Sequence, residues 1–331
     1  MSTMLLTVAG LVIIAVVLLD AFLTILSTST AGPVTRAWSR PLWKGLLVLH
    51  RRRRVHALLG LAGPAMVLVT ILVWYAGLVA GTWLVFSAHP GAVVSNSSGA
   101  AADRSTVFYF VPTTLSGLGY GDYVPTGFPW TVFATTMTLL ATVVLTVSLS
   151  YVISVISAAI TRRTTASDVR ALGGDPVHLA RRARLSDPTQ SMHTYLETVA
   201  SAVSGVAERQ LAYPVLRYFH SSRLETSASA SVLLLADATF LLETGPDADR
   251  PGPGLSHVLH SAIDDFADAK STSGDEGPPD PAGQWLRDCA DRMGSATGAG
   301  SAFEALLPTY LQTRAALVSA CENDGWPPSD L

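Results

Sequence analysis

Three long runs of apolar residues dominate the pattern along the chain. They cover residues 4–26, 61–87 and 130–160, and Asp20 is the only charged residue within them. At about 1.5 Å per helical residue, each run is long enough to cross the roughly 30 Å hydrocarbon core of a bilayer. The third run has no Gly and no Pro, which favours one uninterrupted helix. The pattern therefore predicts three membrane-spanning helices.

A shorter apolar stretch lies between the second and third runs. Residues 90–104 are rich in Gly, Ser and Asn and predict a loop. Residues 105–116 are apolar and aromatic but too few to span a bilayer, and a glycine-rich segment, 117–122, follows them. Non-helical backbone at membrane depth is tolerated only inside protein or beside a water-filled cavity. We therefore predict a re-entrant helix over 105–116 and a pore-lining loop over 117–122.

Glycine occupies every second position of this loop, at Gly117, Gly119 and Gly121. Glycine adopts positive φ without steric cost, so such a segment can turn successive carbonyl groups toward one axis. Rings of backbone carbonyls can replace the hydration shell of K⁺. A dinucleotide-binding loop is the alternative, but it needs a helix directly after its glycines. Pro125 and Pro129 disfavour a helix there.

The sequence Gly119-Tyr120-Gly121-Asp122, after Thr113-Thr114 and a short aromatic helix, resembles the signature of pore-loop potassium channels. The resemblance covers an outer helix (61–87), a pore helix (105–116), a filter (117–122) and an inner helix (130–160). It implies a homotetramer that conducts K⁺ passively, with K⁺ as the transported ion and no cofactor. The ion-binding residues that it implies are Gly117, Leu118, Gly119, Tyr120 and Gly121. The residues that would support the filter are Tyr109, Phe110, Thr113, Thr114, Ser116 and Asp122.

Two positions depart from the family pattern. Gly117 stands where the family usually has threonine, whose hydroxyl forms the innermost ion site, so that site should be weakened. Thr113 stands where several relatives have a glutamate paired with the filter aspartate, so no such carboxyl pair can form with Asp122. A weakly selective cation channel is therefore an alternative to a potassium-selective one. A non-conducting membrane sensor or scaffold is a third reading.

Hydroxyl side chains recur along the predicted inner helix. Those at helical spacing either face a wet cavity or bond back to their own helix, and they are Thr135, Thr138, Thr142 and Thr146. Many relatives bend this helix at a glycine, but Ala141 stands near that place, which argues against a glycine hinge. Voltage sensing needs basic residues within a span. Arg51–Arg54 precede the span instead, so we interpret them as a topology anchor that can contact anionic lipid.

Basic residues between the spans predict the orientation in the membrane. They are frequent in 31–60 and just after 160, whereas the loop between the second and third runs has only Arg104. We expect a cytoplasmic linker (31–60) and C-terminal domain (161–331), with the N-terminus and the filter outside the plasma membrane. No Lys or Arg precedes the first run, so 1–30 is expected to be a retained helix and not a cleaved signal. Asp20 is expected to pair with a basic residue of the linker or to reach the interface from its helix end.

Composition supports the membrane assignment and leaves the C-terminal part without a defined ligand. Charged residues make up 14% of the chain, against roughly 25% in soluble domains. No basic, aromatic-interleaved stretch suggests nucleic-acid binding, and nothing resembles the active site of an enzyme. Cys289 and Cys321 are expected to be reduced and structural.

The C-terminal domain (161–331) is expected to be helical. Periodicity predicts helices near 192–210, 227–243, 255–269 and 301–321, and surface loops at 244–254 and 271–283. The absence of alternating strands and helices argues against a nucleotide-binding regulatory domain. His257, His260 and Asp264 either bind a metal or form polar surface. The predicted fold is an all-α membrane protein with three spans, a re-entrant pore loop and a helical cytoplasmic domain.

Overall fold

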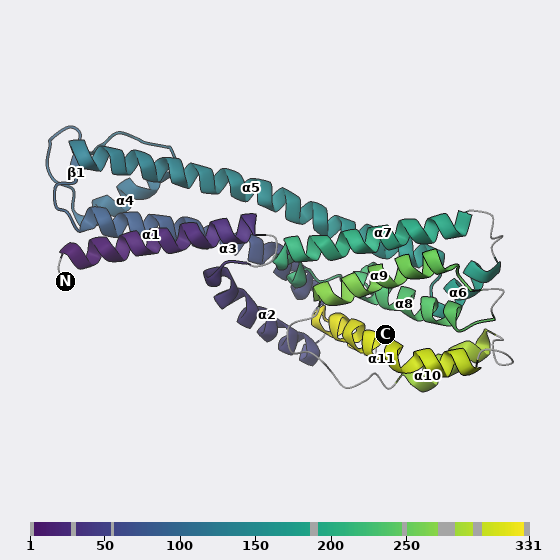
Figure 1. Cartoon of the computed structure of the whole chain (residues 1–331). Helices are drawn as coiled ribbons and strands as arrows, with labels where there is room; N and C mark the ends of the chain where they lie inside the picture. The colour runs from purple at the N-terminus through teal and green to yellow at the C-terminus, as the bar shows by residue number, and fades with distance from the viewer. Residues whose placement is uncertain are drawn as a thin grey trace. The chain divides into compact units, whose positions relative to one another are not determined.

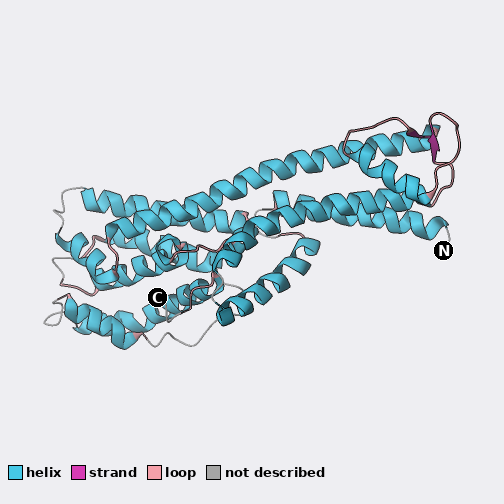
Figure 2. Ribbon diagram, turned by 180° about the vertical axis from the view of Figure 1, so that it is seen from behind, coloured by secondary structure: helices cyan, strands magenta, loops and turns pink. Residues whose placement is uncertain are grey.

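Helices make up nearly all of the secondary structure in the computed structural model of the chain (Figure 2). The structure describes residues 3–27, 31–53, 56–185, 191–246, 250–270, 282–293 and 300–327. The chain divides into two units. The first contains Met1–Leu42 and Pro64–Ser154, and the second contains Trp43–Gly63 and Val155–Leu331.

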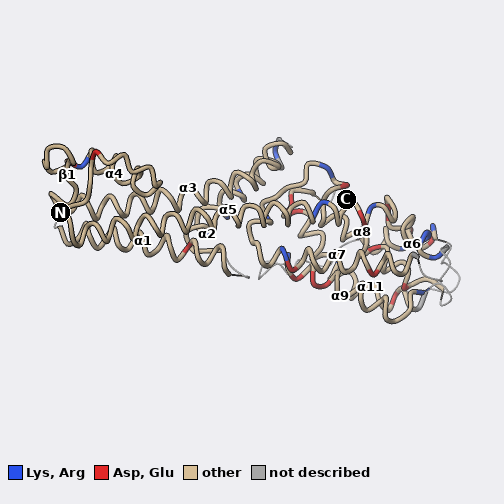
Figure 3. The backbone as a smooth tube through the Cα atoms, turned by 90° about the horizontal axis from the view of Figure 1, so that it is seen from above, with Lys and Arg blue, Asp and Glu red and all other residues tan. Residues whose placement is uncertain are grey.

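Three helices are long and apolar enough to cross a membrane, which confirms the three predicted spans. They are α1 (Thr3–Leu26), α3 (His56–Ser87) and α5 (Gly127–Leu172). Figure 3 shows how few charged residues α1, α3 and α4 carry. α1 packs closely on α3: a methyl group on Gly10 would lie 2.5 Å from the carbonyl oxygen of Gly81, and one on Gly77 would lie 2.5 Å from Cγ2 of Val17. Small residues that let helix backbones approach are typical of packing within membranes.

Two of the spans are longer than predicted. α3 begins at His56 and not at residue 61, and α5 continues to Leu172, twelve residues past the expected end at 160. The extension of α5 follows from its sequence, because the first helix-breaking residues after Pro129 are Gly173 and Gly174. Residues 155–172 of α5 belong to the second unit.

The predicted linker contains a helix that we did not expect, α2 (Pro33–Arg53). Its first residue is proline, which is well suited to the first turn because its φ is already helical and its missing N–H has no intrahelical partner. Its last turn is rich in arginine, which complements the negative end of the helix dipole. In this arginine run the side chain of Arg52 is exposed, and Arg54 lies outside the described residues.

Asp20 is buried in the first unit, and its described hydrogen-bond partners differ from the basic residue that we expected. Its side chain is 0% exposed and accepts hydrogen bonds from the first turn of α2 and from α3. The donors are the backbone N–H of Val34 (2.7 Å), the hydroxyl of Thr35 (2.6 Å) and the indole Nε1 of Trp74 (2.8 Å). The acid therefore caps α2 and joins three helices, and none of these described donors is a basic residue.

The helix predicted over 105–116 is confirmed to within one residue by α4 (Arg104–Leu115). Asp103 caps its N-terminus and accepts from the N–H of Thr106 at 2.8 Å. The segment predicted as a loop also contains a strand, β1 (Val93–Ser95), which pairs antiparallel with β2 (Tyr123–Pro125). This short ribbon connects the residues before α4 to those after the glycine loop.

The second unit is a helical bundle around a central helix, α8 (Ala228–Glu243) (Figure 1). α8 is buried along almost its whole length and contacts α6 (Pro176–Leu185), α9 (Pro253–Lys270), α10 (Gly283–Arg292) and α11 (Gly300–Asn323). α7 (Ser191–Ala212) packs on α9. Two short 3₁₀ helices, η1 (Pro214–Tyr218) and η2 (Leu224–Thr226), lie between α7 and α8.

The four predicted C-terminal helices correspond to α7, α8, α9 and α11, whereas α6 and α10 were not predicted. Among the described residues of this unit there is no strand, as expected. Cys289 and Cys321 are buried free thiols. Of the two predicted surface loops, residues 247–249 and 271–281 lie outside the described residues.

Candidate functional site: the glycine loop and its supports

The C-terminal end of α4 holds the start of the glycine loop. The N–H of Gly117 donates to the carbonyl of Thr114 at 3.0 Å, and the N–H of Gly119 donates to that of Thr113 at 3.1 Å. The carbonyls that lose their helical partners at the end of α4 thus receive hydrogen bonds from the loop. The hydroxyl of Ser116 also donates to the Thr113 carbonyl, at 3.1 Å.

The three alternating glycines all have left-handed backbone. The φ angles of Gly117, Gly119 and Gly121 are 77°, 51° and 81°. Any residue with a side chain would be strained in this conformation, because its Cβ would approach the backbone. A chain that changes handedness at every second residue can turn neighbouring carbonyls in one direction, as the sequence predicts.

Hydrogen bonds to residues near β1 hold the C-terminal end of the loop and the segment that follows it. The N–H of Asn96 donates to the carbonyl of Asp122 at 2.8 Å, and the hydroxyl of Thr126 donates to that of Gly91 at 2.7 Å. The Asp122 carboxylate interacts with the phenol of Tyr109, a partner that the sequence did not suggest. Thr113, which stands where several relatives have a glutamate paired with the filter aspartate, donates to its own helix, at the carbonyl of Phe110 (2.8 Å).

Tyr109 and Phe110 are the aromatic residues that the resemblance implies as filter supports, and the structure places Tyr109 beside Tyr120. The rings of Tyr109 and Tyr120 are parallel within 3°, with centroids 6.4 Å apart. Phe110 is buried in the core, where its ring meets Phe86 at 5.5 Å. The side chains of Leu118 and Tyr120 are exposed in the single chain, by 63% and 67%.

The predicted hydroxyl residues form part of a longer stripe on α5. Every hydroxyl donates to the carbonyl four residues earlier, which leaves its oxygen lone pairs free to accept. Thr138 also reaches the carbonyl of Thr114 at 3.4 Å, which ties α5 to the end of α4. Sequence reasoning stopped at Thr146, although the same spacing of four continues. The stripe contains Thr138, Thr142, Thr146, Ser150 and Ser154, with Thr135 beside its upper end.

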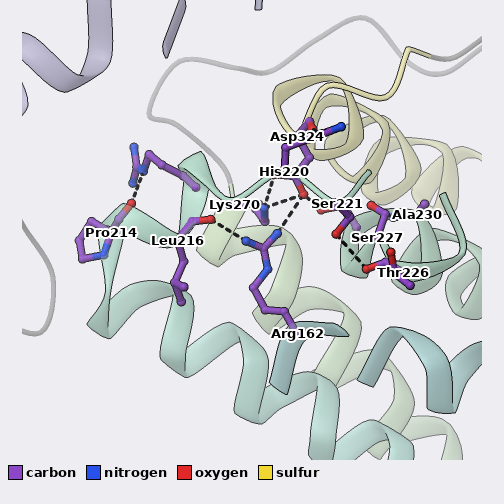
Figure 4. A network of polar contacts seen from close by, with 12 residues as sticks. Arg162, Pro214, Leu216, His220, Ser221, Thr226, Ser227, Ala230, Lys270 and Asp324 are labelled. Carbon is purple, nitrogen blue, oxygen red and sulfur yellow. Dashed lines mark hydrogen bonds and ion pairs between the residues drawn. The ribbon is translucent and has the colours of Figure 1, made fainter. Parts of the chain in front are cut away.

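Beyond the stripe, α5 carries a buried arginine into a polar network of the second unit (Figure 4). Arg162 donates to the carbonyl of Leu216 at 2.5 Å and pairs with the Asp324 carboxylate at 3.2 Å. Lys270 of α9 lies 2.7 Å from the same carboxylate, and Ser229 of α8 donates to it at 2.5 Å. One carboxylate thus joins α5, α8 and α9.

Burial and neighbouring charges shift the pKa values of Lys270 and Asp324 in opposite directions. Burial lowers the pKa of Lys270 to about 8, against the opposing attraction of Asp324. Burial alone would raise the pKa of Asp324, but Lys270 and Arg162 outweigh it and hold that pKa below its usual range. The carboxylate and the ammonium are therefore both charged near neutral pH.

Three histidines gather next to this network, although they are far apart in the sequence. Nδ1 of His220 lies 2.6 Å from the carbonyl of Asp324, and its Nε2 lies 3.1 Å from Nδ1 of His56. Because a carbonyl can only accept, His220 carries its proton on Nδ1 and accepts from His56 through Nε2. The ring of His50 is 4.5 Å from that of His56. No sequence spacing could have indicated this cluster.

The metal alternative for α9 is not supported. His260 contacts the carboxylate of Glu243, at 2.9 and 2.8 Å from its two oxygens. Within the described ranges no group of three histidine, cysteine or acidic side chains is arranged to hold a metal ion.

Comparison with known proteins finds a match to an ion channel family model and a similar membrane protein. Residues 66–158, which contain α4, the glycine loop and most of α3 and α5, match a family model described as "Ion channel". The chain is also similar to an uncharacterized membrane protein of Bacillus subtilis strain 168, YdjJ. The two are 28% identical over 281 residues, which cover 83% of this chain and 82% of that protein. No solved structure matches the chain.

Proposed function

We propose, on the premise that residues 66–158 match a family model of ion channels, that the protein is a homotetrameric potassium channel. K⁺ moves passively through a path lined by the backbone carbonyls of Gly117 to Gly121. The observation that carries the proposal is the alternation of positive φ at three glycines. Carbonyls that replace water around a dehydrated ion need this kind of backbone.

Exposed apolar surface supports assembly from four copies. One loop supplies only one carbonyl to each ring, so a closed cage needs further copies around an axis. Leu118 and Tyr120 are large, apolar and exposed in one chain, and so are Leu139, Leu145 and Leu149 of α5. Neighbouring copies and lipid tails would cover these side chains. The hydroxyl stripe of α5 would then line the water-filled cavity below the filter.

The three spans and the membrane-protein relative place the chain in a membrane, and we propose that this is the plasma membrane. Basic α2 and the second unit would face the cytoplasm, with the filter outside. Arg51–Arg54 would contact anionic lipid headgroups.

The test is the reversal potential of the purified protein in a planar bilayer with K⁺ on one side and Na⁺ on the other. A potassium channel shifts the reversal potential strongly toward the K⁺ equilibrium value. Gly119→Ala should abolish this current or its selectivity. Gly99→Ala is a matched control, because Gly99 also has positive φ (68°) and open space around its Cα but lies outside the filter.

The alternatives give different results. Clear current that reverses near zero would identify a weakly selective cation channel, and Gly117→Thr should then increase its preference for K⁺. A closed gate could also silence the current. A second measurement therefore compares the thermal unfolding midpoint of the protein in K⁺ with its midpoint in Na⁺, which reports binding of K⁺ without any current. Absence of both current and K⁺ stabilisation would favour a non-conducting sensor.

A further inference from the structure

A cavity of about 250 Å³ lies in the second unit, beside the last turn of α5. Its walls come from α5, α6, α8, α10 and α11, together with the loop that joins α5 to α6. Leu233 and Leu234 of α8 give it an apolar side, and Trp285 of α10 gives it an aromatic one. This volume is slightly below the roughly 300–1,000 Å³ that is common for ligand pockets, so the cavity suits only a compact molecule.

Of the three arginines in the wall, Arg170 is the one for which no described acid lies at ion-pairing distance. Arg314 pairs with Asp237, with Nε 2.8 Å from Oδ1, and lies over the ring of Trp285 at 5.1 Å. Arg292 pairs with Asp175 at 4.0 Å. Three arginines therefore face two aspartates around the cavity.

Arg170 is the arginine that is left over. Its half-buried side chain makes two long contacts, to the carbonyl of Gly174 (3.4 Å) and to the hydroxyl of Ser231 (3.5 Å). Neither of these two partners carries a charge. The carboxylate of Glu225 in η2 attracts Arg170 from beyond ion-pairing distance, but its side chain is 63% exposed and pairs with Arg223 at 3.7 Å. A guanidinium has five N–H donors in a planar fork that matches a carboxylate, so most of its hydrogen-bonding capacity remains available.

We propose that this cavity binds a small organic monoanion, namely a carboxylate attached to a compact apolar or aromatic body. The carboxylate pairs with Arg170, which contributes charge-assisted hydrogen bonds. The apolar body lies between Leu233, Leu234 and the ring of Trp285. A cation would be repelled by Arg170, and a neutral molecule would leave this guanidinium balanced only by the more distant, largely exposed Glu225.

The position of Arg170 gives this site a regulatory role that rests on the proposed channel function. Arg170 is part of α5, the same helix whose residues 127–154 belong to the pore unit. A ligand held by Arg170, α8 and α10 fixes the last turn of α5 in the bundle. The occupied site therefore biases the conformation of the inner helix, and so the fraction of open channels.

The binding test uses benzoate as the probe and benzamide as its neutral counterpart of the same shape. Calorimetry on the full chain in detergent should give saturable binding of benzoate and at least tenfold weaker binding of benzamide. Arg170→Gln should weaken benzoate binding at least tenfold. Arg163→Gln, seven residues earlier on α5 and outside the cavity, should leave it unchanged. Equal binding of the two probes, unchanged binding by Arg170→Gln or absence of binding would overturn the proposal.

A second variant keeps the test valid if Arg170→Gln does not fold. Trp285→Ala keeps the guanidinium but removes the aromatic wall, so it should weaken benzoate much more than acetate. Equal loss for the two anions would contradict the proposed position of the apolar body.

Conduction is measured separately, so the two proposals fail in different ways. Calorimetry needs no current, and a protein that binds benzoate but does not conduct would overturn only the channel function. In a conducting preparation, benzoate on the side of the second unit should change the open fraction in the wild type but not in Arg170→Gln. Binding without any change in open fraction would overturn the regulatory role alone.

Discussion

The smallest feature with a clear structural role is the carboxylate of Asp20. It lies in an otherwise apolar helix, yet its oxygens accept from Val34, Thr35 and Trp74. The first turn of α2 contributes backbone N–H groups and the positive end of a helix dipole, both of which favour an anion. A methyl group on Gly32 would collide with this carboxylate, so glycine is required at that position.

Asp20→Ala should destabilise the protein strongly. The substitution leaves the indole of Trp74 and the hydroxyl and N–H groups of α2 buried without an acceptor. We expect a loss of about 2–3 kcal/mol in the free energy of unfolding. The measurement is the thermal unfolding midpoint in detergent, with Leu19→Ala, an exposed neighbour on α1, as the control. Equal midpoints for the two variants would contradict a structural role of the carboxylate.

Sequence reasoning identified Asp20 as unusual but could not find its partners. Thr35 and Trp74 are 15 and 54 residues away, and only tertiary packing brings them to the acid. The glycines of the loop are the opposite case. Their spacing is local, so the backbone conformation that they need could be predicted before any contact was known.

At the scale of elements, the extension of α5 is held by the Asp324 network. Arg162 contributes from α5, Lys270 from α9 and Ser229 from α8, and all three are bound to one buried carboxylate. Removing one partner of a buried ion pair is costly, because the remaining charge keeps its desolvation penalty.

Lys270→Met should therefore lower the free energy of unfolding by about 3–5 kcal/mol. Hydrogen exchange should also become faster in residues 155–172, because Arg162 loses its shared anchor. Arg287→Gln provides the comparison, since the Arg287–Glu304 pair has similar geometry but is largely exposed. That variant should have little effect. Similar losses in both variants would show that burial of the network does not matter.

Acid should weaken the histidine cluster beside this network. Burial lowers the pKa of His220, and the nearby rings of His56 and His50 lower it further, against the Asp324 carbonyl. The unfolded chain then takes up the proton more readily than the native one. Neutral His220 therefore stabilises the fold fully at a pH above the ordinary histidine pKa of about 6.5, and this stabilisation is lost as the pH falls below that pKa.

The charge of the Asp324 carboxylate opposes this lowering of the His220 pKa, but burial and the two other histidines outweigh it. Trp326 stacks on its ring, and Lys270 and Arg162 add positive charge around the Asp324 carboxylate. The unfolding midpoint should fall between about pH 7 and pH 5, and His220→Gln should make that fall shallower. His193→Gln, at an exposed histidine of α7, should not. Parallel curves for the wild type and His220→Gln would assign the pH dependence to other groups.

Elements were predictable in proportion to their length and apolar character. The three spans and α4 have strong hydrophobic signals, and so does the buried α8. α6 and α10 have ten residues each, too few for a reliable helical period. α2 was not predicted, because its charged residues suggested a linker without regular structure. The Asp324 network combines residues from positions 162 to 324, so no local pattern could indicate it.

At the scale of the whole molecule, the exposed apolar side chains of the loop and of α5 imply further copies of the chain. Mass measurement of the detergent-solubilised protein should give four times the 34.9 kDa of one chain after correction for detergent. Leu118→Asp places a charge in the surface that neighbouring copies would cover, so it should shift the protein toward smaller species. Val258→Asp, at an exposed position of α9 outside both the loop and the spans, serves as the control. A monomeric wild type would contradict the tetramer.

The burial of Asp20 also has a consequence for the order of events during synthesis. α1 leaves the ribosome first, when neither Thr35 nor Trp74 has been made. At that time its carboxylate has no protein partner, and the acid remains costly to bury in lipid. The first turn of α2 then provides some of the hydrogen-bond donors for the Asp20 carboxylate. The last donor, Trp74, arrives only when α3 has entered the membrane. α1 is therefore stably integrated only late, and a chain that stalls before α3 exposes an unpaired acid that quality control can recognise.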